Sequence, residues 1–497
     1  MKVAFYTLGC KLNQAETESL ITQFSEAGFQ IVAPHDIADI YVANTCTVTH
    51  IADRKSRHWL RLMRRRNPEA LIIATGCYAQ RAPQELTPIA DLVLGNDGKG
   101  HLLDIVKGSL SFPFVGTSPS PLVILRERSD RRISSSLCSE LWLTRINSAR
   151  QSYSSRVRSL IKIQDGCHSP CTYCIVPQVR PQEYSLPTSE IIEEVKRKTA
   201  LGYKEVVLTG TKIGCYRDGN ITLGDLVRCI LDNTDIERLR LSSLQPQELS
   251  AKFLALWQDT VLSRSSEPFA SCHSERSEES HTAQGKLRKG EESYIAQDGL
   301  REGTSEGPRL CRHFHLALQS GSDAVLQRMR RRYSLNNYQR TLNLIREAIP
   351  GVAITTDIIV GFPGESDEEF EQSYKFCRQA GFANIHVFPF SARPGTLAAS
   401  MPEQIDESVK KERKQKMLEL AQYCRQSFCQ QFLGQTMGVL WEKEVNPGSG
   451  IYSGLTDNYI RVFVRSEKSL SNKLTPARLL GFHNQGIWGE LVGEDSG

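Results

Sequence analysis

The sequence predicts an α/β protein with three parts: an open α/β N-terminal domain, a partial (β/α) barrel and a small C-terminal β-barrel. Short apolar runs of strand length alternate with amphipathic helical patterns over most of the chain. This alternation is typical of parallel sheets whose strands are joined by helices. Two polar segments interrupt it, and only short strands and turns follow residue 434. These changes of pattern divide the chain into its expected domains.

The N-terminal domain is expected over residues 1–116. Helical patterns at 14–27, 50–66 and 98–107 separate its apolar runs. These runs have the length of buried parallel strands, and they are Val3–Leu8, Ile40–Ala43, Leu71–Ala74 and Leu92–Leu94. Ligands of open α/β sheets bind outside the carboxyl ends of the strands. We therefore expect the functional loops of this domain to follow these strands.

The middle domain is expected over residues 157–433, with its site at the C-terminal ends of the barrel strands. Its candidate strands are Ser159–Ile163, Glu205–Leu208, Leu239–Leu241, His313–Leu318, Ile354–Val360 and Ala383–Phe388. A basic helical pattern at 404–433 ends this domain. Over residues 434–497, turns separate the short strands Val439–Trp441, Tyr459–Val464 and Gly489–Val492. This pattern predicts a small β-barrel.

Two segments fit neither pattern. Residues 117–156 are rich in Ser and Arg and show weak periodicity, which indicates a linker or an insertion. Residues 263–308 are polar, charged and poor in apolar side chains. Such a segment buries too little surface to fold alone, so we expect a disordered insertion. Both segments fall outside the cysteine-bearing loops, and we expect the fold to tolerate them.

The bulk composition indicates a globular cytoplasmic protein. The chain has 497 residues, of which 40% are hydrophobic and 24% charged, and its net charge is +5. No window approaches the 18 apolar residues of a membrane span, so no membrane partner is expected. The N-terminus runs into a strand-like segment and lacks the features of a signal peptide. In a reducing cytosol, clusters among the 14 cysteines are metal ligands or catalytic thiols rather than disulfides.

The strongest motif is Cys167-x-x-x-Cys171-x-x-Cys174, which follows a candidate strand. Three thiolates at this spacing can ligate three irons of a [4Fe–4S] cluster, and the fourth iron stays open for another ligand. A closed zinc site would need a fourth Cys or His nearby, and His168 is poorly placed to share a metal with Cys167. The motif therefore favours an iron–sulfur cluster over a zinc site or redox thiols.

This motif resembles that of the radical S-adenosylmethionine superfamily in its spacing, in its position after the first barrel strand and in the aromatic Tyr173. The resemblance implies that Cys167, Cys171 and Cys174 are the catalytic cluster ligands. The amine and carboxylate of S-adenosylmethionine would chelate the open iron. An electron from the cluster would then cleave the sulfonium and yield a 5′-deoxyadenosyl radical.

Four further residues are candidates for binding the cofactor. Tyr173 lies within the cysteine motif, and Gly210 follows a strand where the superfamily places a loop near the amino group of the cofactor. Gln319 and Gly361 each begin a polar or Gly-rich loop after a strand, and such loops could cradle ribose and adenine. The alternative for Gly210 is an ordinary strand-to-helix turn.

A second set of cysteines lies at the ends of three predicted strands. Cys10, Cys46 and Cys77 are far apart in the sequence, but the ends of parallel strands meet at one edge of the sheet. We therefore expect them to converge as metal ligands. The alternative is three unrelated buried cysteines, since free Cys is often buried as a small hydrophobe.

This set matches the three cluster ligands of the methylthiotransferase family. The runs His315–Ser322 and Gly361–Glu365 also look like that family, and Gly454–Tyr459 is similar to its terminal tRNA-binding TRAM barrel. The resemblance covers nearly the whole chain outside the two unusual segments. It implies a second [4Fe–4S] cluster on Cys10, Cys46 and Cys77, which carries the sulfur that a second S-adenosylmethionine methylates.

The motif Thr7–Gln14, Thr-Leu-Gly-Cys-Lys-Leu-Asn-Gln, is similar to that of members that act on N6-threonylcarbamoyladenosine at tRNA position 37 and add a methylthio group at C2. Members that act on isopentenyladenosine tend toward Tyr-Gly-Cys-Gln-Met-Asn, and those that act on ribosomal protein S12 tend toward Gly-Cys-Pro-Lys-Asn. Both remain alternatives, as does a non-catalytic RNA-binding protein with structural metal. The chain departs from the family at Pro181, where Gly is frequent, and at Gln245, where an acidic residue is frequent.

The resemblance implies two partners: the anticodon loop of tRNA, and an electron donor such as flavodoxin or ferredoxin. Loops of RNA are bound by charge and base stacking. Three features are candidates for this contact: the stripe at 54–66 with seven Lys/Arg and Trp59, the run Arg328–Arg332, and the terminal barrel. The alternative for both basic segments is a solvated helix face.

Overall fold

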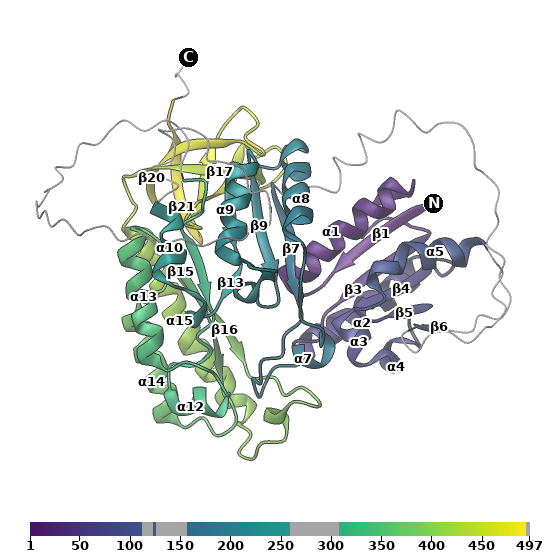
Figure 1. The fold of residues 1–497 in the computed structure, drawn as a ribbon, viewed down its shortest axis with the longest axis horizontal. Coiled ribbons are helices and arrows are strands. Elements are labelled where there is room, and N and C mark those ends of the chain that lie inside the picture. The colour runs from purple at the N-terminus through teal and green to yellow at the C-terminus, as the bar shows by residue number, and fades with distance from the viewer. Residues whose placement is uncertain (112–122, 126–156, 259–307, 494–497) are drawn as a thin grey trace, which may run out of the picture.

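The computed structural model describes residues 1–111, 123–125, 157–258 and 308–493 (Figure 1). The expected linker or insertion at 117–156 therefore lies outside the described residues, apart from residues 123–125. The same holds for the expected insertion at 263–308, apart from residue 308. In the described part of the chain, no helix is long and apolar enough to cross a membrane.

The N-terminal domain is a six-stranded sheet in the order β2-β1-β3-β4-β5-β6. The strands are β1 (Lys2–Thr7), β2 (Gln30–Val32), β3 (Ile40–Thr45), β4 (Leu71–Gly76), β5 (Leu92–Leu94) and β6 (Val123–Leu125). All pairs are parallel except β5 with β6. The four expected strands are present. The two unexpected strands are short, lie at the sheet edges and carry little periodic signal.

Helices cover both faces of this sheet, with a hydrophobic cluster on each face. They are α1 (Lys11–Glu26), α2 (His50–Arg66), α3 (Cys77–Arg81), α4 (Pro83–Leu86), the 3₁₀ turn η1 (Lys99–His101) and α5 (Leu102–Ser111). The α2 helix begins where the Thr49 side chain accepts a hydrogen bond from the Ala52 amide, which satisfies a free N–H of the first turn. The loops that follow β1, β3 and β4 therefore open directly into α1, α2 and α3.

The middle domain is a partial barrel of six parallel strands, as the sequence predicts. They are β7 (Arg158–Asp165), β9 (Glu205–Gly210), β12 (Arg238–Leu241), β14 (His313–Leu316), β15 (Ala353–Val360) and β16 (Asn384–Pro389). They form two sheets, ordered β12-β9-β7-β8 and β13-β14-β15-β16. A parallel bridge between Leu239 and Leu310 joins the sheets. The barrel stays open between β7 and β16, and the N-terminal α1 helix packs against β7 (Figure 1).

Short strands and helices complete this domain. The minor strands are β8 (Tyr184–Ser185), β10 (Arg217–Asp218), β11 (Ile221–Thr222) and β13 (Ser243–Leu244). The helices are α7 (Val176–Val179), α8 (Thr188–Ala200), α9 (Leu223–Asn233), α10 (Ala251–Leu254), α12 (Asp323–Arg328), α13 (Leu335–Ala348), α14 (Asp367–Ala380) and α15 (Glu407–Gln430), with the 3₁₀ turns η2 (Ile213–Cys215), η3 (Pro246–Glu248) and η5 (Leu397–Ala399). Capping boxes, in which N-cap and N3 residues bond each other's backbone, start α9 and α14.

The C-terminal domain is a closed five-stranded barrel in the order β17-β18-β19-β21-β20. Its strands are β17 (Thr436–Glu444), β18 (Ile451–Thr456), β19 (Arg461–Arg465), β20 (Leu474–His483) and β21 (Gly486–Leu491). Three of them correspond to expected strands. The sequence pattern missed β18 and β20, which contain Gly454 and Pro476, because these residue types are depleted in strands.

Two arginines, one buried and one half-buried, join this barrel to the middle domain. Arg240 forms an ion pair with Glu205 at 2.7 Å, and both side chains are fully buried. The same guanidinium donates to the carbonyl oxygen of Asp457 in the C-terminal barrel at 2.9 Å. Arg312 pairs with the Asp457 carboxylate at 2.6 Å. The position of the C-terminal barrel is therefore fixed by directional contacts as well as by apolar packing.

We expect Arg240→Ala to destabilise the protein by about 3–5 kcal/mol at pH 7, because it leaves the buried Glu205 carboxylate without its cation. Burial favours the neutral form of Glu205, but Arg240 and its neighbours hold the pKa of Glu205 below the usual value. In the variant, Glu205 becomes protonated as the pH falls, so the destabilisation shrinks on acidification. Urea unfolding between pH 4 and 8 measures this trend. The control Lys375→Ala removes an exposed pair at 3.8 Å, with an expected cost under about 1 kcal/mol at every pH.

Candidate functional site

The structure brings together the three cysteines of the N-terminal domain. Cys10 precedes α1, Cys46 follows β3 and Cys77 opens α3, each at the carboxyl end of one of three neighbouring strands. Cys46 and Cys77 are buried, whereas Cys10 is exposed. Burial raises the pKa of Cys46 to about 12, with a smaller contribution from charge repulsion by the Cys77 and Cys10 thiols. The three thiols are thus close enough to interact electrostatically, and Cys10 lies at the accessible side.

A glycine brings Cys10 close to Cys46. Gly9 has a φ of 107°, and a Cβ built there would lie 2.8 Å from the Cys46 Cβ. No other residue type fits both this backbone conformation and this close approach. The Asn13 amide fastens the same loops, because its Nδ2 donates to the carbonyls of Leu8 at 2.8 Å and Thr45 at 3.1 Å.

The Cys77 loop is fastened to its neighbour in a similar way. The Thr45 hydroxyl donates to the Thr75 carbonyl at 2.6 Å and accepts from the Ala79 amide at 3.3 Å. Gly76 has a φ of 97°, and a Cβ there would lie 2.5 Å from the Asn44 Oδ1. The ends of β3 and β4 are therefore held in register, and with them the loops that carry Cys46 and Cys77.

The second set, Cys167, Cys171 and Cys174, lies on the single loop after β7. The Cys174 amide donates to the Cys171 carbonyl at 3.1 Å, and the Ser169 amide donates to the Cys167 sulfur at 3.4 Å. Thr172 anchors the loop, since its hydroxyl donates to the Arg328 carbonyl at 3.0 Å. The thiol of Cys174 also has a pKa raised by burial to about 12, with the charges of Cys171 and Cys167 adding to the rise.

Both sets fit the donor chemistry of an iron–sulfur cluster. Each offers three cysteine sulfurs and no nitrogen ligand, as expected for a cluster with one open iron. Within the described ranges, no group of three His, Cys, Asp or Glu side chains is close enough to hold a single metal ion. Burial disfavours a thiolate unless positive charge compensates it. Each set therefore needs cations beside it.

Two arginines supply this charge, and sequence reasoning missed both. Arg180 Nε donates to the Cys77 sulfur at 3.4 Å, and Arg331 Nη1 donates to the Cys171 sulfur at 3.5 Å. In the sequence only its neighbour Pro181 stands out, and Arg180 itself carries no local signal. Arg331 stands out only as part of the basic run Arg328–Arg332. The contacts join residues 103 and 160 positions apart, so no local pattern could indicate them.

Arg180 also joins the two cysteine sets. The Cys167 amide donates to the Arg180 carbonyl at 3.3 Å, while the Arg180 side chain contacts Cys77 in the other domain. Ile175 and Val179, which follow the second motif, pack directly against Cys77. The two sets are therefore neighbours across the interface between the domains.

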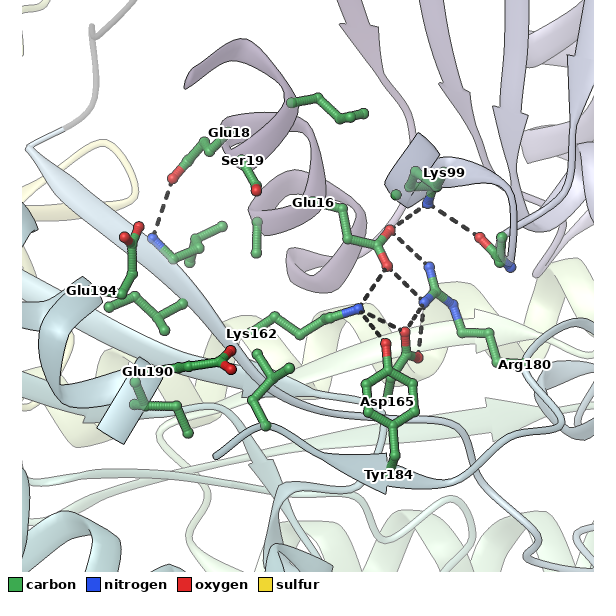
Figure 2. Close-up of a pocket in the computed structure, with 18 of the residues that line it drawn as sticks. Glu16, Glu18, Ser19, Lys99, Lys162, Asp165, Arg180, Tyr184, Glu190 and Glu194 are labelled. Carbon is green, nitrogen blue, oxygen red and sulfur yellow. Dashed lines mark hydrogen bonds and ion pairs between the residues drawn. The ribbon is translucent and has the colours of Figure 1, made fainter. Parts of the chain in front are cut away.

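A buried ionic network surrounds Arg180 (Figure 2). Its Nη1 lies 2.8 Å from a Glu16 oxygen and 2.7 Å from an Asp165 oxygen. Lys99 lies 2.5 Å from Glu16, and Lys162 lies 3.0 Å from Asp165. Burial alone would raise the pKa of Glu16, but its three cationic neighbours hold it well below the usual value. This network lines a cavity of about 590 Å³ between α1, β7 and α8.

Two of the four further cofactor candidates have a structural reason for their residue type. A Cβ at Gly210 would lie 2.6 Å from the Gln164 carbonyl oxygen, between β7 and β9. Gly361 has a φ of 72°, and a Cβ there would lie 2.4 Å from the Lys410 Cγ. Close packing therefore explains both glycines, and their contact with the cofactor stays a prediction.

Of the other two candidates, Tyr173 lies within the second cysteine motif and Gln319 has a strained backbone conformation. Tyr173 packs against an apolar cluster that contains Phe362 and Phe390, and burial raises its pKa well above the usual value. Gln319 has a φ of 72°, which is rare outside glycine and marks functional sites when the surroundings enforce it. Its amide donates to the Asp357 carbonyl at 2.8 Å, which holds this conformation. Contact of Gln319 with the cofactor also stays a prediction.

The seven cations of α2 divide into two groups. Arg57, Arg64 and Arg66 make hydrogen bonds or ion pairs within the N-terminal domain. The remaining four are exposed, and the described residues offer them neither an ion pair nor a hydrogen bond: Arg54, Lys55, Arg61 and Arg65. We call these four the α2 basic face. It begins at the end of α2 that adjoins the Cys46 loop.

The run Arg328–Arg332 is largely internal. Arg328 pairs with Glu369 at 2.5 Å, and Arg331 contacts Cys171. Only Arg330 and Arg332 are exposed. Contact of this run with RNA stays a prediction that now rests on two side chains.

Two family models match the chain. Residues 2–95 match a family described as "Uncharacterized protein family UPF0004". Residues 161–243 and 300–377 match the radical SAM superfamily. The first match covers Cys10, Cys46 and Cys77, and the second covers the CxxxCxxC motif.

Curated relatives extend over nearly the whole chain. The threonylcarbamoyladenosine tRNA methylthiotransferase MtaB of Bacillus subtilis is 31% identical, covering 99% of this chain and 97% of the relative. The MtaB of Aquifex aeolicus is 35% identical, covering 93% and 96%. The chain belongs to the MtaB family. It is thus a radical SAM methylthiotransferase, and its closed terminal barrel is consistent with the TRAM domain expected from the sequence.

Two further comparisons bear on the subfamily and the fold. A tRNA-2-methylthio-N(6)-dimethylallyladenosine synthase of Syntrophotalea carbinolica is 29% identical, covering 98% of this chain and all of the relative. Among solved structures, the radical S-adenosylmethionine methyltransferase TsrM from Kitasatospora setae matches with a TM-score of 0.50 at 14% identity, covering 80% of this chain and 77% of that chain. The latter likeness supports the fold of the MtaB-family chain.

We expect Gly9→Ala to displace Cys46 and to impair assembly of the N-terminal site. The positive φ and the 2.8 Å approach cost about 1–3 kcal/mol with any side chain. Iron content after anaerobic reconstitution should fall toward half that of the unaltered protein. The matched control is Gly100→Ala in the same domain, where a Cβ meets nothing within 4 Å. Equal iron contents in the two variants would contradict this reading of Gly9.

Proposed function

We propose that this MtaB-family enzyme adds a methylthio group to C2 of N6-threonylcarbamoyladenosine at tRNA position 37, using S-adenosylmethionine and two [4Fe–4S] clusters. The observation that supports this most is the junction at Arg180. A single residue there touches Cys167 through its carbonyl and Cys77 through its side chain. A radical site and a sulfur-donating site must act on one carbon atom, and adjacent cysteine sets satisfy that need.

In this proposal each cysteine set holds one cluster and leaves one iron open to a reactant. When bound, the clusters and S-adenosylmethionine supply radical chemistry at an unactivated C–H bond, which side-chain bases do not attack at pH 7. The chain itself holds the cysteines in place, because Gly9, Gly76 and Thr172 fix the positions of cysteine-bearing loops. Exposed Cys10 leaves the N-terminal set accessible from outside.

Four residues are proposed to bind S-adenosylmethionine at the barrel. Gly210 is the last residue of β9, and Gln319 and Gly361 follow β14 and β15, so all three lie at the C-terminal strand ends where barrel enzymes bind substrates. Tyr173 lies within the cysteine loop itself. The strained Gln319 backbone is the member of this group with the clearest signal of function.

The proposed partners are the anticodon loop of tRNA and a small electron donor such as flavodoxin or ferredoxin. The α2 basic face suits the RNA, because its unpaired cations lead away from the Cys46 loop along one side of the helix. Four residues that span about three turns cover about 16 Å, which is enough to meet successive phosphates. A tRNA substrate also places the enzyme in the cytoplasm.

Mass spectrometry of tRNA nucleosides and of ribosomal protein S12, in a strain that lacks its own tRNA and S12 methylthiotransferases, tests the proposed function. Expression of this chain should restore 2-methylthio-N6-threonylcarbamoyladenosine, whereas Cys46→Ala and Cys171→Ala should not. Restoration of 2-methylthio-isopentenyladenosine instead, or of a modified ribosomal protein S12, would move the enzyme to an alternative substrate. An unchanged profile with iron-loaded protein would refute the proposal.

Iron counts test the two clusters separately. We expect about eight irons per chain after anaerobic reconstitution and about four in either Cys46→Ala or Cys171→Ala, because each cluster holds four irons. The control Cys377→Ala removes a buried cysteine outside both sets and should keep about eight. A full count in either ligand variant, or zinc in place of iron, contradicts the proposed cluster assignment.

The α2 basic face gives a prediction for RNA binding. Changing Arg54, Lys55, Arg61 and Arg65 to Ala should weaken tRNA binding and lower the slope of log K against log salt by about 3, since each lost phosphate contact lowers it by nearly one. Four other surface lysines serve as a charge-matched control set: Lys196, Lys375, Lys411 and Lys416. Equal losses in both sets would show a general charge effect and reject the face as a specific contact.

A further inference from the structure

Each cysteine set receives one arginine hydrogen bond at a sulfur, but the two arginines differ in origin. Arg331 and Cys171 belong to the same barrel domain, and their contact is 3.5 Å. Arg180 also belongs to the barrel domain, yet it contacts Cys77 of the N-terminal domain at 3.4 Å. The Asn96 amide of the N-terminal domain also donates to the Cys77 sulfur, at 3.7 Å. The N-terminal set therefore obtains its cationic donor, but not its only donor, when the two domains are docked.

The contacts of Arg180 orient its guanidinium toward the sulfur. Nη1 donates to Glu16 and Asp165 at 2.7–2.8 Å, and Nη2 donates to Glu16 at 2.9 Å and Asn13 at 3.1 Å. These acceptors engage both terminal nitrogens, so Nε is the nitrogen left to face Cys77. A lysine side chain has a single nitrogen, so it lacks the separate nitrogens with which Arg180 contacts the carboxylates and the Cys77 sulfur.

The charge of the network is not balanced by its own members. Three cations, Arg180, Lys99 and Lys162, face two carboxylates, Glu16 and Asp165 (Figure 2). Lys162 is partly exposed, so solvent shares its charge, whereas Arg180 and both carboxylates are buried. The Arg180 guanidinium is the cation of this network that contacts the Cys77 sulfur.

We propose that Arg180 is a positioning residue that sets the reduction potential of the N-terminal cluster, and that it couples this potential to the docking of the two domains. This inference rests on the proposed function, in which Cys10, Cys46 and Cys77 hold a cluster. Hydrogen bonds to cluster sulfurs and nearby positive charge both raise the reduction potential of a cluster. The physical reason is that the reduced cluster carries one more negative charge, which a cationic N–H donor stabilises.

The test is a redox titration followed by electron paramagnetic resonance in full-length, reconstituted protein. Cys167→Ala, Cys171→Ala and Cys174→Ala together provide a background that holds only the N-terminal cluster. In this background, Arg180→Gln should shift the midpoint potential to a more negative value. Arg180→Lys keeps the positive charge but loses the separate N–H groups of the guanidinium. Its midpoint potential should therefore lie between that of the unaltered background and that of Arg180→Gln.

A second variant protects the test against misfolding. Arg180→Gln with Asp165→Asn removes one cation and one anion together, so fewer carboxylates are left uncompensated. It should still show a negative shift, smaller than that of Arg180→Gln alone, because the Nε donor to Cys77 is lost while a nearby negative charge is also removed. Asp165→Asn alone keeps Arg180 and removes a negative charge, so its potential should shift in the positive direction. A purely structural role does not predict this reversal of sign.

Arg331→Gln is the matched control. It should leave the potential unchanged in the background that lacks the barrel cysteines, and should alter only the barrel cluster in otherwise unaltered protein. Unchanged potentials in Arg180→Gln and in its double variant with Asp165→Asn, with a full cluster present, would overturn the inference and leave the proposed function standing. Absence of iron from the triple-alanine background would overturn the inference and the two-cluster proposal together.

Discussion

The buried ion pairs between Arg180, Glu16 and Asp165 determine how the two cysteine-bearing domains meet. Glu16 lies on α1 of the N-terminal domain, whereas Asp165 and Arg180 flank the CxxxCxxC loop of the barrel. Buried pairs add little net stability but become costly when a partner is missing. They therefore penalise any other arrangement of the domains and keep Cys77 beside the loop of Cys167. The placement of both proposed clusters depends on this interface.

Cysteines that are buried to protect a cluster are harder to deprotonate, although they bind iron as thiolates. A protected cluster needs buried cysteines, yet burial raises the pKa of Cys46 and Cys174 to about 12 and so opposes the thiolate form. The chain brings one arginine to each set, at Cys77 and at Cys171. Arg180 thus compensates the N-terminal set at the domain boundary, whereas Arg331 compensates the barrel set from within the barrel domain of this MtaB-family chain.

Much of the fold was predictable because its signals are local. The four central strands of the N-terminal sheet are mostly apolar runs, and among the six barrel strands β7, β12 and β14 alternate apolar with polar residues; the strands of both sets were expected within a few residues of their observed bounds. The missed strands β2 and β6 are short edge strands of three residues, and β18 and β20 contain glycine or proline. Their pairing depends on neighbours that are distant in sequence, so no local window reports it.

The sequence by itself determined the identities of the six cysteines and their positions after strands, because ligand type and spacing are written in consecutive residues. It also predicted the three-part architecture and the methylthiotransferase family. Only the tertiary structure decided that Gly9 packs on Cys46, that Arg180 contacts Cys77, and that four of the seven α2 cations are unpaired. Contacts of this kind join residues tens to hundreds of positions apart, and only the folded chain sets their distances and charges.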